Sequence, residues 1–246
     1  MSDLSQRQRQ ILKHLVEEYM NTAEPVGSET LEKKYNLGAS PATLRNEMVR
    51  LTEMGFLAKP HTSAGRAPTP VGLKYYVTDL MKEQELSVAE EVAVKEKIWD
   101  YRSELEKLMR EATRNLAART KNLAISATSE GDMYASGTCH ILEMPEFYDI
   151  DVTRNLLALL DKTDYFSKLI ERFMQDEDIH VLVGEELGSD AYINYGFVFG
   201  RFHAADDQEG VIGVLGPARL NYPYIIPTVR YFSDLIGEVS ESLNKA

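Results

Sequence analysis

The chain has 246 residues, of which 43% are hydrophobic and 27% charged; this is the composition of a globular protein and argues against general disorder. Its one cysteine, Cys139, excludes an internal disulfide and any site with several cysteine ligands. The net charge of −12 is unevenly divided: residues 1–82 contain 11 basic and 9 acidic residues and the remainder 16 and 30, so that a polyanionic partner is expected to meet the first part only.

The first predicted element is an amphipathic helix that starts after Ser5. Its apolar residues recur at intervals typical of one helix face. They are Ile11, Leu12, Leu15, Val16, Tyr19 and Met20. A short second helix is predicted from Ser28, its expected N-cap, to Tyr35. Residues 36–39 then indicate a turn.

The third predicted helix lies in the sequence SPATLRNEMVRLTEMG, residues 40–55. Ser40 is its expected N-cap, and Pro41 is its first helical residue, where the missing N–H costs little. Leu44, Met48 and Leu51 recur at helical spacing and are expected to be buried.

The outward face of this third helix carries hydrogen-bonding side chains. At about 100° per residue, Ala42, Asn46 and Arg50 point away from the buried residues, and two further polar residues lie on the flanks. Arg and Asn side chains pair with guanine and adenine edges, and a helix start with small residues fits a major groove. The helix is therefore a predicted recognition helix. Its candidate DNA-binding residues are Ser40, Thr43, Arg45, Asn46 and Arg50.

A basic loop, KPHTSAGRAPT at residues 59–69, follows a short strand predicted at residues 56–58. A further amphipathic segment starts at Pro70, so the order of elements is that of a winged helix-turn-helix with the loop as its wing. In this interpretation Gly65 lets the loop turn, and Arg66 enters a narrow minor groove. The residues expected to hold phosphates are Lys59, His61, Thr62 and Ser63.

Three motifs stand in this region: EPVGS at Glu24–Ser28, SPATLRNEM at Ser40–Met48 and KPHTSAGRAPT at Lys59–Thr69. These motifs and their separations closely resemble the N-terminal region of the HrcA family, bacterial heat-inducible transcription repressors. The resemblance implies a winged-helix repressor that binds an inverted-repeat operator, the CIRCE element, upstream of chaperone genes. It also implies that the chaperonin GroEL keeps the repressor folded, so that misfolded protein relieves repression by occupying GroEL.

Residues 83–122 are strongly charged and contain helically spaced apolar residues. These are Leu105, Leu108, Met109, Ala112 and Leu116. The apolar stripe either covers its own domain or pairs with a partner chain. Because an inverted repeat needs a two-fold partner, a homodimer contact is expected somewhere in residues 70–246.

The remaining sequence alternates short strands with helices. Strands are predicted in LAISAT, TCHILEM, IHVLVGEE, YGFVFGRFH and GVIGVLGP. The last two flank the turn-rich AADDQEG and are expected to form an antiparallel pair. Helices are predicted at residues 152–160, 166–174 and 225–243. Strands mixed with helices, without regular βαβ alternation, indicate an α+β fold.

GPARLNY, residues 216–222, is similar to a GPxRMxY motif of the HrcA family, with Leu220 where Met is usual. The family's Gly-x-Glu-Asn appears at Gly184–Leu187 without the Asn. This resemblance implies a GAF-like C-terminal domain. The chain is shorter than typical members between about Ser129 and Asp151, where the family places much of its sheet and an inserted dimerising domain. The family's usual dimer contact is therefore not carried over to this chain.

The predicted organisation has three parts. A winged-helix DNA-binding domain occupies residues 1–82, a helical linker or dimerisation helix residues 83–122, and a reduced GAF-like α+β regulatory domain residues 123–246. Two other functions stay open. The GAF-like domain would make the chain a small-molecule-responsive regulator, or the chain would be an acidic protein-interaction module with a vestigial DNA-binding end.

No enzyme is predicted, because phosphate-loop, nucleophile and metalloprotease motifs are missing from the sequence. Cys139 and His140, as neighbours in a predicted strand, would point to opposite faces. Asp206, Asp207 and Glu209 form one acidic turn, which is usually only solvated, so no metal and no cofactor is expected. The polar N-terminus and the lack of an apolar run of about 20 residues predict a soluble cytoplasmic protein without a membrane partner.

Overall fold

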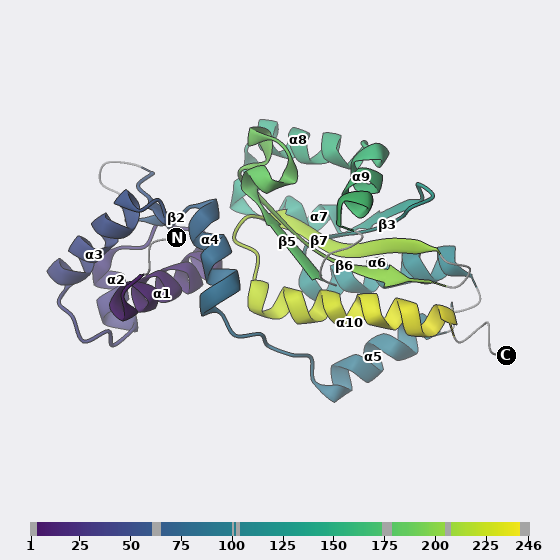
Figure 1. Ribbon diagram of the computed structural model, residues 1–246, viewed down its shortest axis with the longest axis horizontal. Coiled ribbons are helices and arrows are strands. Elements are labelled where there is room, and N and C mark those ends of the chain that lie inside the picture. Colours follow the sequence, from purple (N-terminus) through teal and green to yellow (C-terminus); the bar gives the residue numbers. More distant parts are fainter. Residues whose placement is uncertain are drawn as a thin grey trace. The chain divides into compact units, whose positions relative to one another are not determined.

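The computed structural model describes residues 4–60, 65–99, 101, 104–173, 179–204 and 208–241 (Figure 1). The chain forms two compact units. Unit 1 consists of Met1–Lys82 together with Ala218–Asn221, and unit 2 consists of Glu83–Pro217 and Tyr222–Ala246. Helices and a five-stranded sheet are mixed without βαβ repetition, which confirms the predicted α+β class.

Unit 1 begins with three helices, α1 Gln6–Thr22, α2 Ser28–Lys34 and α3 Pro41–Glu53. Ser5 caps α1 in a capping box with Gln8. The predicted inner face of α1 is confirmed, because four of its six apolar residues are fully buried. These four are Ile11, Leu12, Leu15 and Val16.

The start of α2 differs from the sequence prediction. Gly27 has an extended backbone and is the N-cap, whereas Ser28 is the first helical residue and is buried. The preceding residue, Val26, forms a β-bridge with Arg66, which keeps the backbone extended up to Gly27. A contact with a distant part of the chain therefore moves the helix start by one residue.

Glu18 of α1 is nearly buried, with a side chain 8% exposed, and it is held by two residues at the end of α2. Lys34 Nζ donates to Glu18 Oε1 at 2.5 Å, and the Tyr35 hydroxyl donates to Oε2 at 3.1 Å. The hydrogen bond from Lys34 holds the pKa of the Glu18 carboxyl below its usual value of 4.5. Burial and the hydrogen bond to Glu18 raise the pKa of Tyr35 to about 12.

Unit 1 is expected to lose stability as the pH falls below about 4.5, because Glu18 becomes protonated. A carboxyl with a lowered folded pKa contributes stability that is complete above its unfolded pKa and is lost as the pH falls through its folded pKa. Glu18→Gln is expected to lower the free energy of unfolding at neutral pH by about 1 kcal/mol. The free energy of unfolding of the Glu18→Gln variant should also depend less on pH below about 4.5. Thermal unfolding across the acid range checks both, and parallel pH curves for the two proteins would contradict the role of Glu18.

A small hairpin follows α3. Strand β1 Leu57–Ala58 pairs antiparallel with β2 Ala67–Pro68, and α4 Pro70–Tyr75 continues into the π-helical turn η1 Tyr76–Leu80. The predicted order of three helices, strand, loop and further helix is thus present. The hairpin positions the two ends of the basic loop beside α3.

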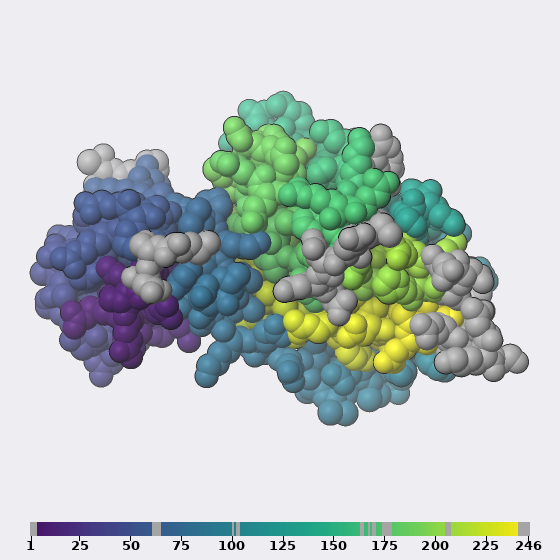
Figure 2. Space-filling view, viewed as in Figure 1, coloured from purple at the N-terminus to yellow at the C-terminus, as the bar shows by residue number. Residues whose placement is uncertain are grey.

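In unit 2, α5 Val88–Trp99 packs on α6 Leu105–Thr120 and on the last helix, α10 Tyr222–Glu241. Helices α5 and α10 lie side by side at the surface in Figure 2. The predicted apolar stripe of α6 faces the sheet of its own unit, with Leu108, Met109, Ala112 and Leu116 buried. Of the two alternatives for this stripe, the structure therefore shows that it covers its own domain.

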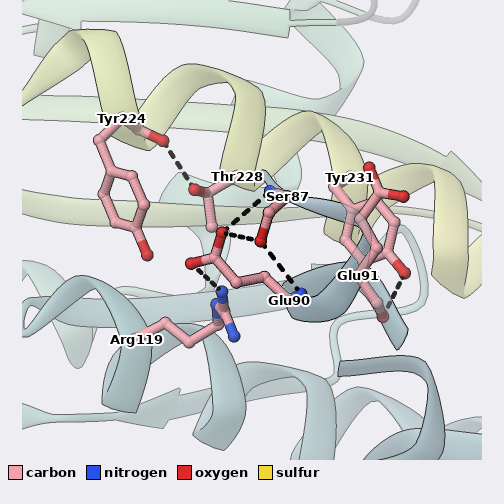
Figure 3. Close-up of polar contacts among 7 residues, drawn as sticks. All are labelled: Ser87, Glu90, Glu91, Arg119, Tyr224, Thr228 and Tyr231. Atoms are coloured by element: carbon pink, nitrogen blue, oxygen red, sulfur yellow. Dashed lines mark hydrogen bonds and ion pairs between the residues drawn. The ribbon is translucent and has the colours of Figure 1, made fainter. Parts of the chain in front are cut away.

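A polar cluster fixes α5 to its neighbours (Figure 3). Arg119 Nη2 of α6 donates to Glu90 Oε1 at 2.8 Å, while the backbone N–H and the hydroxyl of Ser87 donate to Glu90 Oε2. The Tyr231 hydroxyl of α10 donates to the carbonyl of Glu91 at 2.7 Å. Side chains from three helices thus meet at the first turn of α5.

The sheet of unit 2 has five antiparallel strands in the order β4-β3-β7-β6-β5. They are β3 Leu123–Thr128, β4 Met133–Ser136, β5 Ile179–Val183, β6 Tyr195–His203 and β7 Glu209–Pro217. The predicted pairing of the last two strands is confirmed. The strand predicted in GVIGVLGP is present as β7, and its residues 210–217 are buried.

One predicted strand is wrong. TCHILEM forms the short helix α7 Thr138–Ile141, and the strand β4 lies just before it. Gly137 between them has φ 88°, a left-handed backbone that ends the strand and starts the helix. Cys139 is exposed.

Helices cover both faces of this sheet (Figure 1). Helices α6 and α10 pack on one face, and α7, α8 Ile150–Leu160 and α9 Thr163–Phe173 pack on the other. Three 3₁₀ turns complete the second layer: Pro145–Tyr148, Gly184–Leu187 and Asp190–Tyr192. The core under this layer is rich in aromatic residues, namely Phe147, Phe166, Tyr195, Phe197 and Phe199.

Candidate DNA-binding surface

The start of α3 is fixed by its own sequence. The Ser40 hydroxyl accepts the backbone N–H of Thr43 at 3.3 Å and lies 3.0 Å from the Thr43 hydroxyl. Pro41 is the first helical residue, as predicted. The N-terminal turn, where the helix dipole is positive, is therefore held in place with the exposed Ser40 and the half-buried Thr43 at its edge.

The rotation of α3 follows from its buried stripe. Leu44 and Leu51 are 0% exposed and Met48 4%, as the spacing predicts. The opposite face carries the predicted side chains: Arg45, Asn46 and Arg50 are exposed, and Thr43 is half-buried. The structure therefore brings the predicted residues of this helix together on one outward surface.

Arg50 is oriented by a neighbour on its own helix. Arg50 Nη1 donates to Glu47 Oε1 at 2.9 Å, and Gln8 Nε2 of α1 donates to Glu47 Oε2 at 3.0 Å. The Arg50 side chain is 64% exposed, so the ion pair with Glu47 is weak and leaves the guanidinium available to a ligand. Glu47 itself is mostly buried and joins α1 to α3.

The base of the wing is tied to the loop between α1 and α2. Val26 and Arg66 exchange two backbone hydrogen bonds, with N···O distances of 2.8 Å and 2.9 Å. A Cβ on Gly65 would lie 2.3 Å from the Val26 carbonyl oxygen. Gly65 does not have a positive φ, so its small size serves a close backbone approach rather than the turn proposed from the sequence.

The side chain of Arg66 lies against α3. Its Nε donates to the Thr52 hydroxyl at 3.0 Å, and that hydroxyl donates to the Met48 carbonyl at 2.8 Å. Arg66 thus connects the wing to the recognition helix. Lys59, at the other end of the loop, is exposed. The predicted phosphate-binding residues His61, Thr62 and Ser63 lie outside the described residues.

A groove of about 530 Å³ lies between α2, α3 and the base of the wing. Its lining residues are Gly27, Ser28, Glu29, Thr30, Arg45, Met48, Val49, Lys59, Gly65 and Arg66. Three of them are basic and one is acidic, so the groove suits a polyanion. Sequence reasoning missed Ser28, Thr30 and Val49. Val49 is 37% exposed and suits a thymine methyl group; its spacing of four from Arg45 is the signal that was available.

Two family models together match most of the chain. One, described as "Winged helix-turn-helix transcription repressor, HrcA DNA-binding", matches residues 3–84, and the other, "HrcA protein C terminal domain", matches residues 72–226. The chain belongs to the HrcA family. It is a transcription repressor with a winged-helix DNA-binding domain, which confirms the resemblance seen in its motifs.

Relatives named "Heat-inducible transcription repressor HrcA" align along nearly the whole chain. The relative from Symbiobacterium thermophilum is 25% identical over 337 positions, covering 96% of this chain and 99% of the relative. That from Desulforudis audaxviator is 28% identical over 340 positions, covering 98% and 99%. Because these alignments are longer than 246 residues, both HrcA proteins contain segments that this chain lacks.

A solved structure supports the fold. A crystal structure of a hypothetical protein at 2.2 Å resolution matches with a TM-score of 0.74 at 18% identity, covering 99% of each chain. Within the described part of this HrcA-family chain, no three His, Cys, Asp or Glu side chains are placed to hold a metal, and Asp206 and Asp207 lie outside it. Among the described helices, none has the length and apolar character needed to cross a membrane.

Proposed function

We propose that this protein represses heat-shock genes by binding an inverted-repeat operator of the CIRCE type as a homodimer. The observation that supports it most is the single outward surface formed by α3 and the base of the wing. Relatives named as heat-inducible repressors supply the heat-shock context. The domain boundaries of residues 1–82, 83–122 and 123–246 and the GAF-like character of the last part remain part of this proposal.

In the proposed complex, the N-terminal half of α3 enters the major groove. Asn46 and Arg50 face base edges, where Asn pairs with adenine and Arg with guanine. Thr43 and the Ser40 hydroxyl lie at the positive end of the helix, where phosphate oxygens are favoured. Arg45, Lys59 and Arg66 line the groove beside the wing and hold the phosphate backbone in this proposal, with the Nε of Arg66 held by Thr52 of α3.

Dimerisation follows from the symmetry of an inverted repeat, because each half-site needs one recognition helix. The apolar stripe of α6 is buried in its own unit and is not the dimer contact in this proposal. Heating would release the operator by unfolding the repressor, and GroEL would refold it; the chaperone contact is proposed from family membership alone.

The two competing functions make different predictions. A small-molecule sensor should be stabilised by its ligand, so a metabolite that raises the thermal midpoint would favour it. A protein-interaction module with a vestigial DNA-binding end should bind operator DNA equally well after Asn46→Ala and Arg66→Ala. The packed aromatic core between the sheet and α8 and α9 gives the sensor no specific support.

A gel-shift experiment tests the proposal with a CIRCE-type operator, a single half-site and scrambled DNA over a salt series. The expected result is tight binding only to the complete inverted repeat. Log affinity should fall linearly with log salt, with a slope of about 0.9 per phosphate neutralised. Equal affinity for the operator and for a single half-site would contradict binding as a dimer. Equal affinity for the operator and for scrambled DNA would contradict sequence-specific binding.

A further inference from the structure

Unit 1 is not continuous in sequence. After β7 ends at Pro217, the residues Ala218–Asn221 belong to unit 1, and the chain returns to unit 2 as α10. Leu220 in this segment is 2% exposed. The DNA-binding unit therefore includes a four-residue segment supplied from near the opposite end of the chain.

This segment completes the C-terminal end of α1. The last four carbonyls of a helix lack partners within the helix, and the end carries a partial negative charge. The last turn of α1 contains no basic residue, and Glu17 and Glu18 precede it. Ala23, in a left-handed conformation, donates its N–H to the Tyr19 carbonyl, but that satisfies only one of the four.

Arg219 supplies the missing cation. Its Nη1 donates to the Met20 carbonyl at 2.9 Å, although 199 positions separate the two residues. A guanidinium is always charged, and a charged donor at a helix C-terminus both satisfies a carbonyl and opposes the helix dipole. The partly buried position of this hydrogen bond strengthens it relative to a fully solvated one.

The capped helix is the one that supports the recognition helix. Helix α1 packs on α3 and on β2, and Glu18 near its capped end holds Lys34 and Tyr35 at the end of α2, which itself packs on α3. Loosening the end of α1 would therefore loosen the support of the DNA-binding surface. Because β7 and α10 flank residues 218–221, unfolding of those two elements would free the segment and remove the cap.

We propose that Arg219 is a positioning residue for DNA binding, which acts by holding the C-terminal end of α1 in place. The proposal rests on operator binding as the function of unit 1. The proposal also explains how heating would release DNA. When β7 and α10 of unit 2 unfold, Arg219 leaves the end of α1, and the last turn of α1 then frays beneath the recognition surface.

The test compares the full-length protein with its Arg219→Met and Arg219→Lys variants by amide hydrogen exchange and operator binding. In Arg219→Met, amides in the last turn of α1 should exchange about 5- to 30-fold faster, while those of β6 and β7 stay unchanged. The temperature of half-maximal operator binding should fall by about 4–8 °C. Lysine keeps the charge and one donor, so Arg219→Lys should recover part of both losses.

The matched control is Arg230→Met, which removes a surface arginine that pairs with Glu83 in unit 2. It should leave exchange at the end of α1 unchanged. If Arg219→Met does not fold, an intermediate effect of Arg219→Lys at α1 supports the proposal, and no effect overturns it. The proposal is also overturned if both Arg219 variants show the same exchange rates at the end of α1 and the same temperature of operator release as the unmodified protein. If the unmodified protein binds no operator, the proposed function is refuted instead. Hydrogen exchange at the end of α1 then still tests whether Arg219 holds that helix end in place.

Discussion

Gly65→Ala is expected to lower the thermal midpoint of unit 1 by at least about 5 °C and to weaken operator binding about tenfold or more. The added Cβ would lie 2.3 Å from the Val26 oxygen and 2.8 Å from the Gly27 nitrogen, and both are backbone atoms that cannot rotate away. The two hydrogen bonds between Val26 and Arg66 would have to lengthen or break. Overpacking of this kind costs about 1–3 kcal/mol, and in a small domain each 1 kcal/mol lowers the midpoint by about 4–8 °C.

The control for this substitution is Gly27→Ala. It adds the same methyl group on the opposite side of the contact, where the nearest neighbour is the Thr30 hydroxyl at 3.9 Å. Its expected cost is below about 1 kcal/mol, that of a weaker N-cap. Calorimetry and gel shifts on both proteins check the pair. A Gly65→Ala protein that melts and binds like Gly27→Ala would show that the wing does not depend on this approach.

Asn46→Ala is expected to reduce affinity for the complete operator by at least about 30-fold, because each of its two half-sites loses one base contact of about 1–3 kcal/mol. Affinity for scrambled DNA should not change. Asn46 is exposed at the centre of the outward face of α3 and is not one of the residues that this helix buries. The thermal midpoint should therefore also stay at its parental value.

Arg45→Ala is the matched comparison, because Arg45 is the neighbouring exposed residue but faces the groove beside Lys59 and the wing. A phosphate contact at this position in each subunit predicts weaker binding to all DNA sequences and a salt slope smaller by about two. Gel shifts with operator and scrambled DNA separate the two behaviours. Equal losses on both DNAs for Asn46→Ala would place Asn46 on the backbone and leave the base-reading role to other residues.

The DNA-binding helix was predictable from sequence for a physical reason. The buried residues Leu44, Met48 and Leu51 recur at the spacing of about 3.6 residues per helical turn and fix the rotation of α3 about its axis. That rotation decides which side chains of α3 face outward. Ser40 and Pro41 likewise act within one turn. The antiparallel pair β6–β7 was predictable because its strands are long, apolar and joined by a short connection.

Features that depend on distant contacts were not predictable from local patterns. The N-cap of α2 moved to Gly27 because Val26 pairs with Arg66, and Gly65 is required because the same two segments approach closely. Contacts of this kind are set by tertiary structure, which overrides local propensity. The cap that Arg219 provides for α1 joins residues 199 positions apart, and no spacing rule connects them. TCHILEM has too few apolar residues for their spacing to distinguish a strand from a helix.

The most direct test of the central claim is to cut DNA from α3 itself. Ala42 is small, exposed and on the outward face of α3. Cys139 is the only cysteine in the sequence, so a Cys139→Ser protein that also carries Ala42→Cys has a single thiol. An iron chelate attached to that thiol stands at one known position on the helix. The chelate should cleave an inverted-repeat operator within both half-sites, while the Cys139→Ser protein treated in the same way should cut nothing. Cleavage spread evenly over operator and scrambled DNA, or no cleavage of a bound operator, would contradict the claim that this face of α3 meets the duplex.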